Sequence, residues 1–276
     1  FDAICHAFST VAIGGFSNHD ASLGYFNSPL VNIVCTVFLL IAALNFSLHY
    51  AAVSSRSVKG YFKDPEFKAF FFIQATLILI CFLVLVLSGF YESAETALDQ
   101  AMIQAVSIST TAGFATTDFS VWPTFLPILL IFSSFIGGCA SSTGGGLKVV
   151  RVCLLFLQGK REVDRLIHPK AVYAVKLGER AMPDRVVEAV WGFFSAYAVV
   201  FVVLMVGLIA TGLDNLSAFT ATAAMLNNLG PGLGSVASNY ADVSDPGKWI
   251  LVVGMVFGRL EVFSLLVLFS PTFWRS

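Results

Sequence analysis

The chain has 276 residues, of which 57% are hydrophobic and 12% are charged. Soluble globular domains carry roughly 25% charged residues, so this composition excludes an ordinary soluble domain. The formal net charge is −1, and the basic residues lie in loops between apolar stretches without any motif for nucleic-acid binding. Several apolar stretches reach the ~20 residues that cross the ~30 Å hydrocarbon core of a bilayer. The sequence therefore predicts an all-α integral membrane protein in contact with the lipid bilayer.

The first third of the chain predicts a short helix followed by two spans. Residues 3–13 have the character of the end of a short helix, and residues 29–52 and 69–90 are long and apolar enough to cross the membrane. The stretch 54–68 between the spans is polar and basic. Residues 1–16 show no signal-peptide pattern and the chain begins with Phe1, so we expect that a preceding portion of the protein is missing.

The stretch 93–121 carries the strongest functional signal. It predicts an amphipathic helix, too short to span a bilayer, that ends at Ser107 to Ser109 and runs into a Thr- and Gly-rich strand around Gly113. Long apolar stretches flank it on both sides. This order is typical of a re-entrant pore loop, in which backbone carbonyls around Gly113 would coordinate a dehydrated cation.

The next span is interrupted. Residues 122–158 are apolar at both ends, but five glycines occur within the ten residues 137–146. Such a stretch does not sustain a regular helix, and irregular backbone at membrane depth is tolerated only inside protein or beside water. We predict a helix broken by a flexible insert, with a packing kink as the simpler alternative. Residues 159–185 predict a polar, basic loop with a short surface helix.

The last third repeats this order of elements. Residues 186–211 predict a span, Asp214 is placed to cap a short helix over 216–226, and a Gly-rich strand follows. The last span, 249–270, is interrupted by Gly258, Arg259 and Glu261. An Arg at membrane depth is costly and marks a functional site by default, with a structural salt bridge as the alternative.

Span, short helix, Gly-rich strand and span form an internal repeat. Two copies, 69–158 and 186–270, are complete, and 1–52 is a third copy without its first span. Gly15, Gly113 and Gly230 fall at equivalent places. Each short helix would direct its partly negative C-terminal end toward the bilayer centre, which favours a cation there. Ordinary loops with C-capping glycines are the alternative. Three occurrences at equivalent places argue against that alternative more strongly than a single occurrence does.

Charge predicts the orientation. Residues 53–68, 148–185 and the C-terminus hold 14 of the 16 basic residues, so we expect these segments on the cytoplasmic side. The acidic residues of the other segments, with Lys248, would face outside. The short helices therefore enter from the outer face, where acidic residues raise the local concentration of cations.

The sequence gives no sign of an enzyme. The five cysteines are isolated and the four histidines form no metal-ligand spacing. A lipid-modifying membrane enzyme, the alternative of another class, would need a polar catalytic cluster near one membrane interface, and the sequence indicates none. We predict that the protein is not an enzyme.

Four segments resemble one known family. STVAIGGFS (9–17), SISTTAGFATTDFSVWP (107–123), TAAMLNNLGPGLG (222–234) and IGGCASSTGGGLKVVR (136–151) are similar to the Trk/Ktr/HKT superfamily of potassium transporters, closest to its bacterial TrkH/TrkG branch. The resemblance implies four repeats around a pseudo-fourfold pore. It implies that 1–66 is part of the second repeat, 67–185 the third with its cytoplasmic linker, and 186–276 the fourth.

The resemblance also implies the site residues. It places the potassium filter at Ala12, Ile13, Gly14, Gly15, Thr110, Thr111, Ala112, Gly113, Asn227, Asn228, Leu229 and Gly230. Gly14 fits the filter position of its strand sterically as well as Gly15 does. It places an intramembrane gate at Gly137, Gly138, Ser141, Ser142, Thr143, Gly144, Gly145, Gly146 and Arg259.

The function implied is potassium uptake across the bacterial inner membrane by a multi-pass protein, with potassium as the transported ion. A sodium-selective or less selective member of the superfamily is the alternative, and glycine at every visible filter position favours potassium. Coupling to protons or sodium, as in a symporter, stays open beside a simple channel. The expected partners are a second copy of the protein, forming a homodimer, and a cytoplasmic nucleotide-binding ring of the TrkA type.

Overall fold

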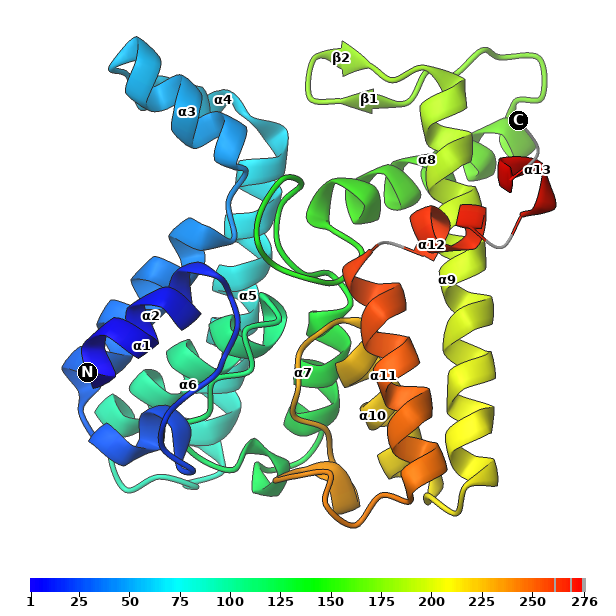
Figure 1. Cartoon of the computed structure of the whole chain (residues 1–276). Coiled ribbons are helices and arrows are strands. Elements are labelled where there is room, and N and C mark those ends of the chain that lie inside the picture. Colours follow the sequence, from blue (N-terminus) through cyan, green and yellow to red (C-terminus); the bar gives the residue numbers. More distant parts are fainter. Residues whose placement is uncertain (261, 269, 275–276) are drawn as a thin grey trace.

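The computed structural model describes residues 1–260, 262–268 and 270–274, so Glu261 and Arg275 lie outside the described residues. The described chain is mostly helical, as Figure 1 shows, and its strands are one small antiparallel hairpin. The strands are β1 (Lys176–Leu177) and β2 (Arg180–Ala181). The helices in chain order are α1 (Asp2–Val11), α2 (Pro29–Ala42), α3 (Phe46–Ser55), α4 (Lys59–Lys63), α5 (Pro65–Leu87), α6 (Ala94–Ser109), α7 (Leu126–Ser134), α8 (Val149–Ile167), α9 (Asp184–Ala210), α10 (Asn215–Leu226), α11 (Asp245–Arg259), α12 (Val262–Leu268) and α13 (Pro271–Trp274), with short 3-10 helices η1 (Ser22–Phe26), η2 (Phe119–Val121) and η3 (Gly234–Val236).

Two helices, α5 and α9, are long and apolar enough to cross a membrane, and the bent pair α2–α3 passes the same test as one unit. Only 28% of the most apolar window of α5 and 22% of that of α9 is buried within the chain. The remaining apolar surface of these helices would be unstable in water, since burial of apolar area is what stabilises such side chains. The chain is therefore an all-α membrane protein, as predicted.

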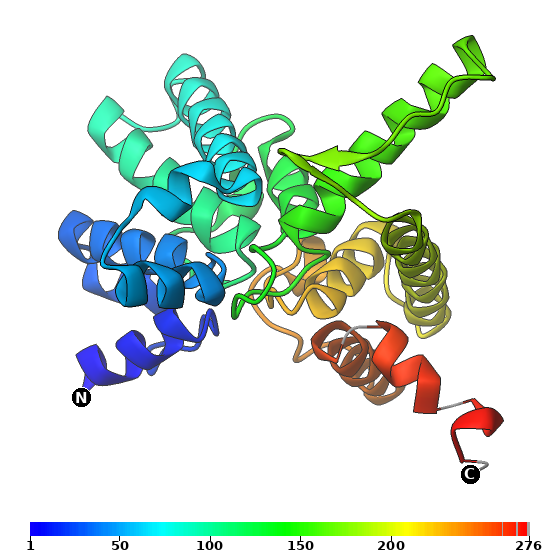
Figure 2. The same ribbon diagram turned by 90° about the horizontal axis from the view of Figure 1, so that it is seen from above.

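The C-terminal part of the short helix α6 lies inside the protein. Its residues Ala97, Ala101, Ala105 and Ile108 belong to a buried apolar cluster with side chains of α5, α7 and α10. Seen from above, the helices radiate from a centre that the loop between α7 and α8 occupies (Figure 2). The protein surrounding α6 and this loop is what allows irregular backbone at membrane depth.

The predicted span 29–52 is not one helix, and this is a correction. α2 ends at Ala42, α3 begins at Phe46, and the two are bent by 89°. The side chain of Asn45 caps α3 by accepting a hydrogen bond from the N–H of Ser47 at 2.8 Å. The carbonyl and N–H groups freed by the break are bonded by residues about a hundred positions later in the chain, as described below.

The basic loop predicted for 159–185 is also different in the structure. The helix α8 continues without a break from Val149 to Ile167, and the hairpin β1–β2 follows it. Polar side chains sustain the extra turns: Gln158 donates to Glu162 at 2.7 Å, and Arg161 pairs with Asp184 of α9 at 2.6 Å. The predicted break before α8 is present, because α7 ends at Ser134.

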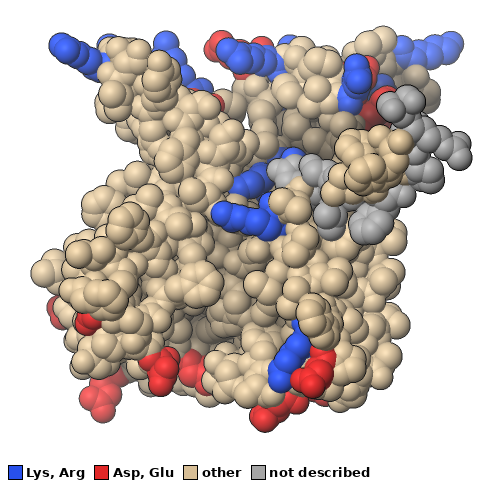
Figure 3. Space-filling view, viewed as in Figure 1, with Lys and Arg blue, Asp and Glu red and all other residues tan. Residues whose placement is uncertain are grey.

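Charged side chains gather at the two ends of the molecule. In Figure 3, Lys and Arg predominate at the end that carries α3 and the hairpin in Figure 1, whereas Asp and Glu predominate at the opposite end. The surface between the two ends carries few charged side chains in the same view. This distribution agrees with a protein whose basic end faces the cytoplasm.

Asp214 caps α10, as predicted, with its carboxylate accepting from the N–H of Ser217 at 3.1 Å. The pKa of this carboxyl is lowered, chiefly by hydrogen bonds from Ser217. We expect Asp214→Ala to cost about 1 kcal/mol of stability and to lower the thermal unfolding midpoint by about 2 °C. Because the folded pKa is depressed, the cap stabilises above the ordinary value of 3.8, and the difference should vanish as the pH falls through the lower folded pKa. Asp214→Asn, which keeps the acceptor oxygen, should lose much less, and an equal loss would contradict the capping role.

Candidate functional site

The three short helices α1, α6 and α10 end in the same way. Their C-cap residues are Ala12, Thr110 and Asn227, the first residue of each predicted filter segment. The third residue of each segment turns back to the helix with its N–H group: Gly14 donates to Ser9 (2.8 Å), Ala112 to Ser107 (2.8 Å) and Leu229 to Ala224 (2.7 Å). The three helix ends therefore share the same hydrogen bond between the third residue of the segment and the carbonyl five residues earlier.

The backbone of the three segments also shares an unusual pattern of dihedral angles. The second residue of each has a positive φ: 50° at Ile13, 69° at Thr111 and 59° at Asn228. The fourth residue of each segment also has a positive φ: 67° at Gly15, 84° at Gly113 and 102° at Gly230. Positive φ is uncommon for residues other than glycine and is most costly for β-branched ones, such as Ile and Thr. The fold imposes the same strained conformation three times, and strain of this kind clusters at functional sites.

The three segments lie against one another. A Cβ atom placed on Gly15 would collide with the carbonyl oxygen of Ala112, and one on Gly113 would collide with the carbonyl oxygen of Leu229. Glycine is therefore required at both places by space as well as by φ. Gly15, and not Gly14, shares its φ with Gly113 and Gly230, so the alignment of the three glycines is the one predicted.

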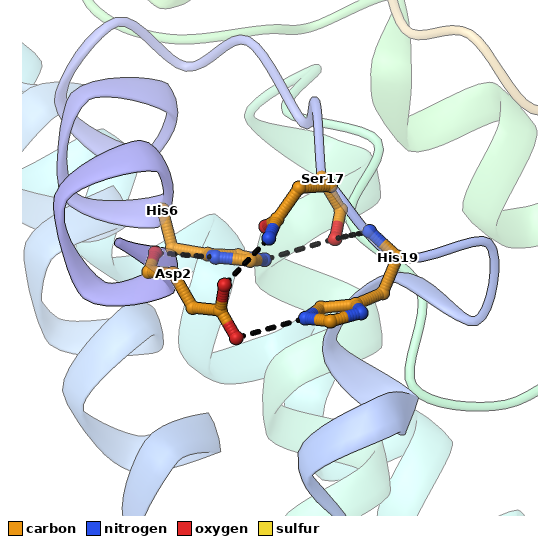
Figure 4. Close-up of polar contacts among 5 residues, drawn as sticks. Asp2, His6, Ser17 and His19 are labelled. Carbon is orange, nitrogen blue, oxygen red and sulfur yellow. Dashed lines mark hydrogen bonds and ion pairs between the residues drawn. The ribbon is translucent and has the colours of Figure 1, made fainter.

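Polar side chains bond each short helix to residues that follow its segment, and the sequence did not reveal them. In α1, His6 donates through Nδ1 to the carbonyl of Asp2 at 2.8 Å and shares a hydrogen bond of 2.9 Å with Ser17 through Nε2 (Figure 4). The Asp2 carboxylate lies 2.9 Å from Nε2 of His19. The pKa of Asp2 is lowered, first by the hydrogen bond from His19 and then by that from Asn18.

Different residues make the hydrogen bonds at the other two segments. Ser107 of α6 donates to the carbonyl of Phe114 at 2.7 Å, and Thr220 of α10 accepts from the N–H of Leu233 at 3.0 Å. Tyr240 donates to the carbonyl of Gly230 at 2.7 Å. Buried polar groups on a short apolar helix are the signal that could have revealed these residues, since a buried hydroxyl needs a partner.

The loop between α7 and α8 fills the break between α2 and α3. The N–H of Cys139 donates to the carbonyl of Ala43 at 2.8 Å, and the N–H of Phe46 donates to the carbonyl of Ser141 at 3.2 Å. At the base of the loop, the N–H of Val149 donates to the carbonyl of Gly138 at 3.0 Å. The loop 137–146, which contains the predicted gate and is called the gate loop below, is thus anchored at the break between α2 and α3.

The tip of the gate loop lies at the inner ends of the three segments. The N–H of Gly145 donates to Oγ1 of Thr111 at 2.7 Å, and Oγ1 of Thr143 donates to the carbonyl of Val11, at the end of α1, at 3.0 Å. A Cβ on Gly145 would collide with the carbonyl oxygen of Asn227. The loop therefore contacts all three predicted filter segments or the helices that end at them.

Basic side chains reach the gate loop. Arg259, at the C-terminal end of α11, donates through Nη1 to the carbonyl of Thr143 at 3.2 Å, and Lys148 donates to the carbonyl of Gly144. The space-filling view shows basic side chains in the hollow in the middle of the molecule (Figure 3). The alternative pairing of Arg259 with Glu261 falls outside the described residues.

Backbone groups of the kind that bind cations gather at the three segments. Three helix C-termini, each with roughly half a negative charge, end there. The carbonyl oxygens of Ala112 and Leu229 lie against Gly15 and Gly113 of the neighbouring segments. Carbonyl oxygens are the ligands that replace the hydration shell of an alkali cation. Such segments, surrounded by apolar helices, are typical of membrane transport proteins for cations.

The family follows from comparison with known proteins. A family model described as "TrkH: Cation transport protein" matches residues 1–276, and the chain belongs to this family. The chain is 66% identical over 278 residues to the Trk system potassium uptake protein TrkH of Vibrio parahaemolyticus and 60% identical over 276 residues to that of Escherichia coli. Each alignment covers 100% of this chain and 57% of the relative, so the chain spans little more than half of their length.

A solved structure gives the same result. The crystal structure of the potassium transporter TrkH from Vibrio parahaemolyticus superposes with a TM-score of 0.95 at 65% sequence identity, over 99% of this chain and 59% of that one. The predicted resemblance and the all-α membrane fold are confirmed. The names of the relatives describe transport within a Trk system and not catalysis, in agreement with the prediction that the protein is not an enzyme.

Proposed function

We propose that the chain forms most of a pathway by which potassium enters a bacterial cell. The observation that carries this proposal is the contact of Gly15 with the Ala112 carbonyl and of Gly113 with the Leu229 carbonyl, which brings the three segments to one place. The names of the relatives, which are potassium uptake proteins, support potassium as the transported ion.

In this proposal residues 12–15, 110–113 and 227–230 are the selectivity filter. Potassium sheds its water at the outer end, and backbone carbonyls take the place of the lost ligands. The partial negative charge at the ends of α1, α6 and α10 offsets part of the cost of dehydration. Glycine at the fourth position of all three segments favours potassium over sodium, because no side chain distorts the carbonyl ring.

The gate loop is the barrier in this proposal. Its tip lies at the inner ends of the filter segments, and the guanidinium of Arg259 adds a positive charge there. A cation leaving the filter would meet both the loop and this charge, whose repulsion is stronger in a medium of low dielectric constant. Opening requires the hydrogen bonds of Thr143 and Gly145 to break while the base of the loop stays folded.

The remaining assignments follow from the same proposal. The protein is a multi-pass protein of the inner membrane, with the basic end in the cytoplasm. Residues 1–66, 67–185 and 186–276 correspond to the second, third and fourth repeats of a pseudo-fourfold pore. The partners are a second copy of the protein and a cytoplasmic nucleotide-binding ring of the TrkA type, for which the basic segment 159–185 is the docking surface.

The test is the uptake of rubidium, as a substitute for potassium, and of sodium into liposomes that contain the full-length protein. We expect rubidium uptake well above that of protein-free liposomes and above that of sodium at equal concentration. Equal rates for the two ions would contradict potassium selectivity, and the absence of uptake of either ion would contradict the transport function.

A further inference from the structure

Glu66 is a buried carboxylate that the proposed pathway does not use. It lies in the first turn of α5 and is 6% exposed. A buried carboxylate is costly unless it is hydrogen-bonded. Its Oε1 atom accepts two hydrogen bonds, from the N–H of Ala140 at 2.7 Å and from the N–H of Val150 at 3.1 Å.

The two donors lie on opposite sides of the tip of the gate loop. Ala140 is in the first half of the loop, before the tip, and Val150 is in the first turn of α8, which follows the loop. The tip residues Thr143 and Gly145 lie between them in the chain. One oxygen atom of α5 thus joins both sides of the loop at its base, and the N-terminus of α8 further favours a negative charge at this place.

A simpler role for Glu66, as an acid at the N-terminus of its own helix, does not account for this geometry. Asp64 already caps α5 by accepting from the N–H of Phe67 at 2.8 Å. The side chain of Glu66 instead accepts its hydrogen bonds from the gate loop and from α8. Hydrogen bonds to a charged acceptor are about twice as strong as neutral ones. A carboxylate therefore holds the two N–H groups more firmly than an amide would.

We propose that Glu66 is a positioning residue that clamps the base of the gate loop, so that only the tip moves when the pathway opens. This inference rests on the proposed gate function. Loss of the negative charge weakens the hydrogen bonds from the N–H groups of Ala140 and Val150, and the loop then opens more readily at its base. The closed state is weakened. The filter segments keep their geometry, because the hydrogen bonds of Glu66 come from Ala140 and Val150 and not from these segments.

The first measurement is amide hydrogen exchange in the full-length protein carrying Glu66→Gln, which keeps the size of the side chain and removes its charge. We expect exchange of the segment 138–150 to accelerate about tenfold, equivalent to roughly 1.4 kcal/mol of lost local stability, with α6 unchanged. Exchange in 138–150 at the wild-type rate would overturn the inference, and so would acceleration across the whole protein, because it would indicate general destabilisation.

The second measurement is rubidium uptake as a function of rubidium concentration. For Glu66→Gln we expect the maximal rate to rise about threefold, with the concentration at half-maximal uptake and the rubidium-to-sodium ratio unchanged. Glu66→Asp, which keeps the charge on a shorter side chain, should lie between Gln and the wild type. Glu188→Gln, an exposed acid on α9, is the matched control and should behave as the wild type in both measurements.

The outcomes separate the clamp from the transport function. If the wild type moves rubidium but Glu66→Gln alters neither loop exchange nor maximal rate, the clamp is wrong and the pathway stands. If the wild type moves no cation, the proposed function is wrong, and hydrogen exchange still decides whether Glu66 holds the loop.

Discussion

Replacing Gly113 by serine lowers the rubidium-to-sodium uptake ratio of the full-length protein by about tenfold or more. Gly113 has φ of 84°, and a Cβ there would collide with the Leu229 carbonyl oxygen. Serine must therefore either move that carbonyl or leave the left-handed conformation, and each change costs of order 1–3 kcal/mol. Since 1.4 kcal/mol is a factor of ten in an equilibrium constant, the loss of preference for the larger ion should be large.

A matched control separates crowding of the carbonyl from backbone strain. Gly89, in the turn after α5, has φ of 62°, but a Cβ there would meet nothing within 4 Å. Gly89→Ser therefore imposes a similar strain far from the proposed filter. It should keep the wild-type ratio of rubidium to sodium. Equal ratios in Gly113→Ser and wild type, with both proteins folded, would contradict the filter assignment.

Deleting residues 138–145 should raise the rate of rubidium uptake about tenfold and remove its regulation. The deletion removes the tip of the loop, which donates hydrogen bonds to Thr111 and to the carbonyl of Val11. It can be closed without distortion of the helices, because Gly137 and Gly146 already lie together: a Cβ on Gly146 would be 2.9 Å from the Cα of Gly137. The barrier at the inner ends of the filter segments should then be absent, while the filter keeps its own hydrogen bonds to α6 and α10.

The deletion also removes the acceptor of Arg259, so Arg259→Ala is its natural comparison. That variant leaves the loop in place and removes one hydrogen bond and one positive charge. We expect its uptake rate to lie between the wild type and the deletion. The control is that the deletion variant keeps the unfolding midpoint of the wild type. If its uptake then stays as low and as regulated as in the wild type, the loop is not the gate.

Local sequence signals were sufficient for the short helices. The end of α6 and both ends of α10 were predicted within a residue or two, because a polar, Gly-containing segment follows each helix and Asp214 caps the start of α10. The alignment of Gly15, Gly113 and Gly230 could be predicted as well, since positive φ strongly favours glycine. The break before α8 followed from the density of glycines in 137–146.

The bend between α2 and α3 could not be predicted in the same way. No glycine or proline lies between Ala42 and Phe46, and Asn45 alone signals a new helix start. The bend depends on hydrogen bonds from Cys139 and to Ser141, which are distant in sequence. Glu66 was missed for the same reason. An acid in the first turn of a helix is common, and nothing local shows that its partners are in the gate loop.

The most direct test of the central claim is the position of bound rubidium in a crystal of the full-length protein, located by its anomalous scattering. The proposed filter predicts rubidium between the carbonyls of residues 12–15, 110–113 and 227–230, on the outer side of the gate loop. The same crystal of Gly113→Ser should show a weaker or displaced signal. Rubidium bound elsewhere, with no signal between these three segments, would contradict the account.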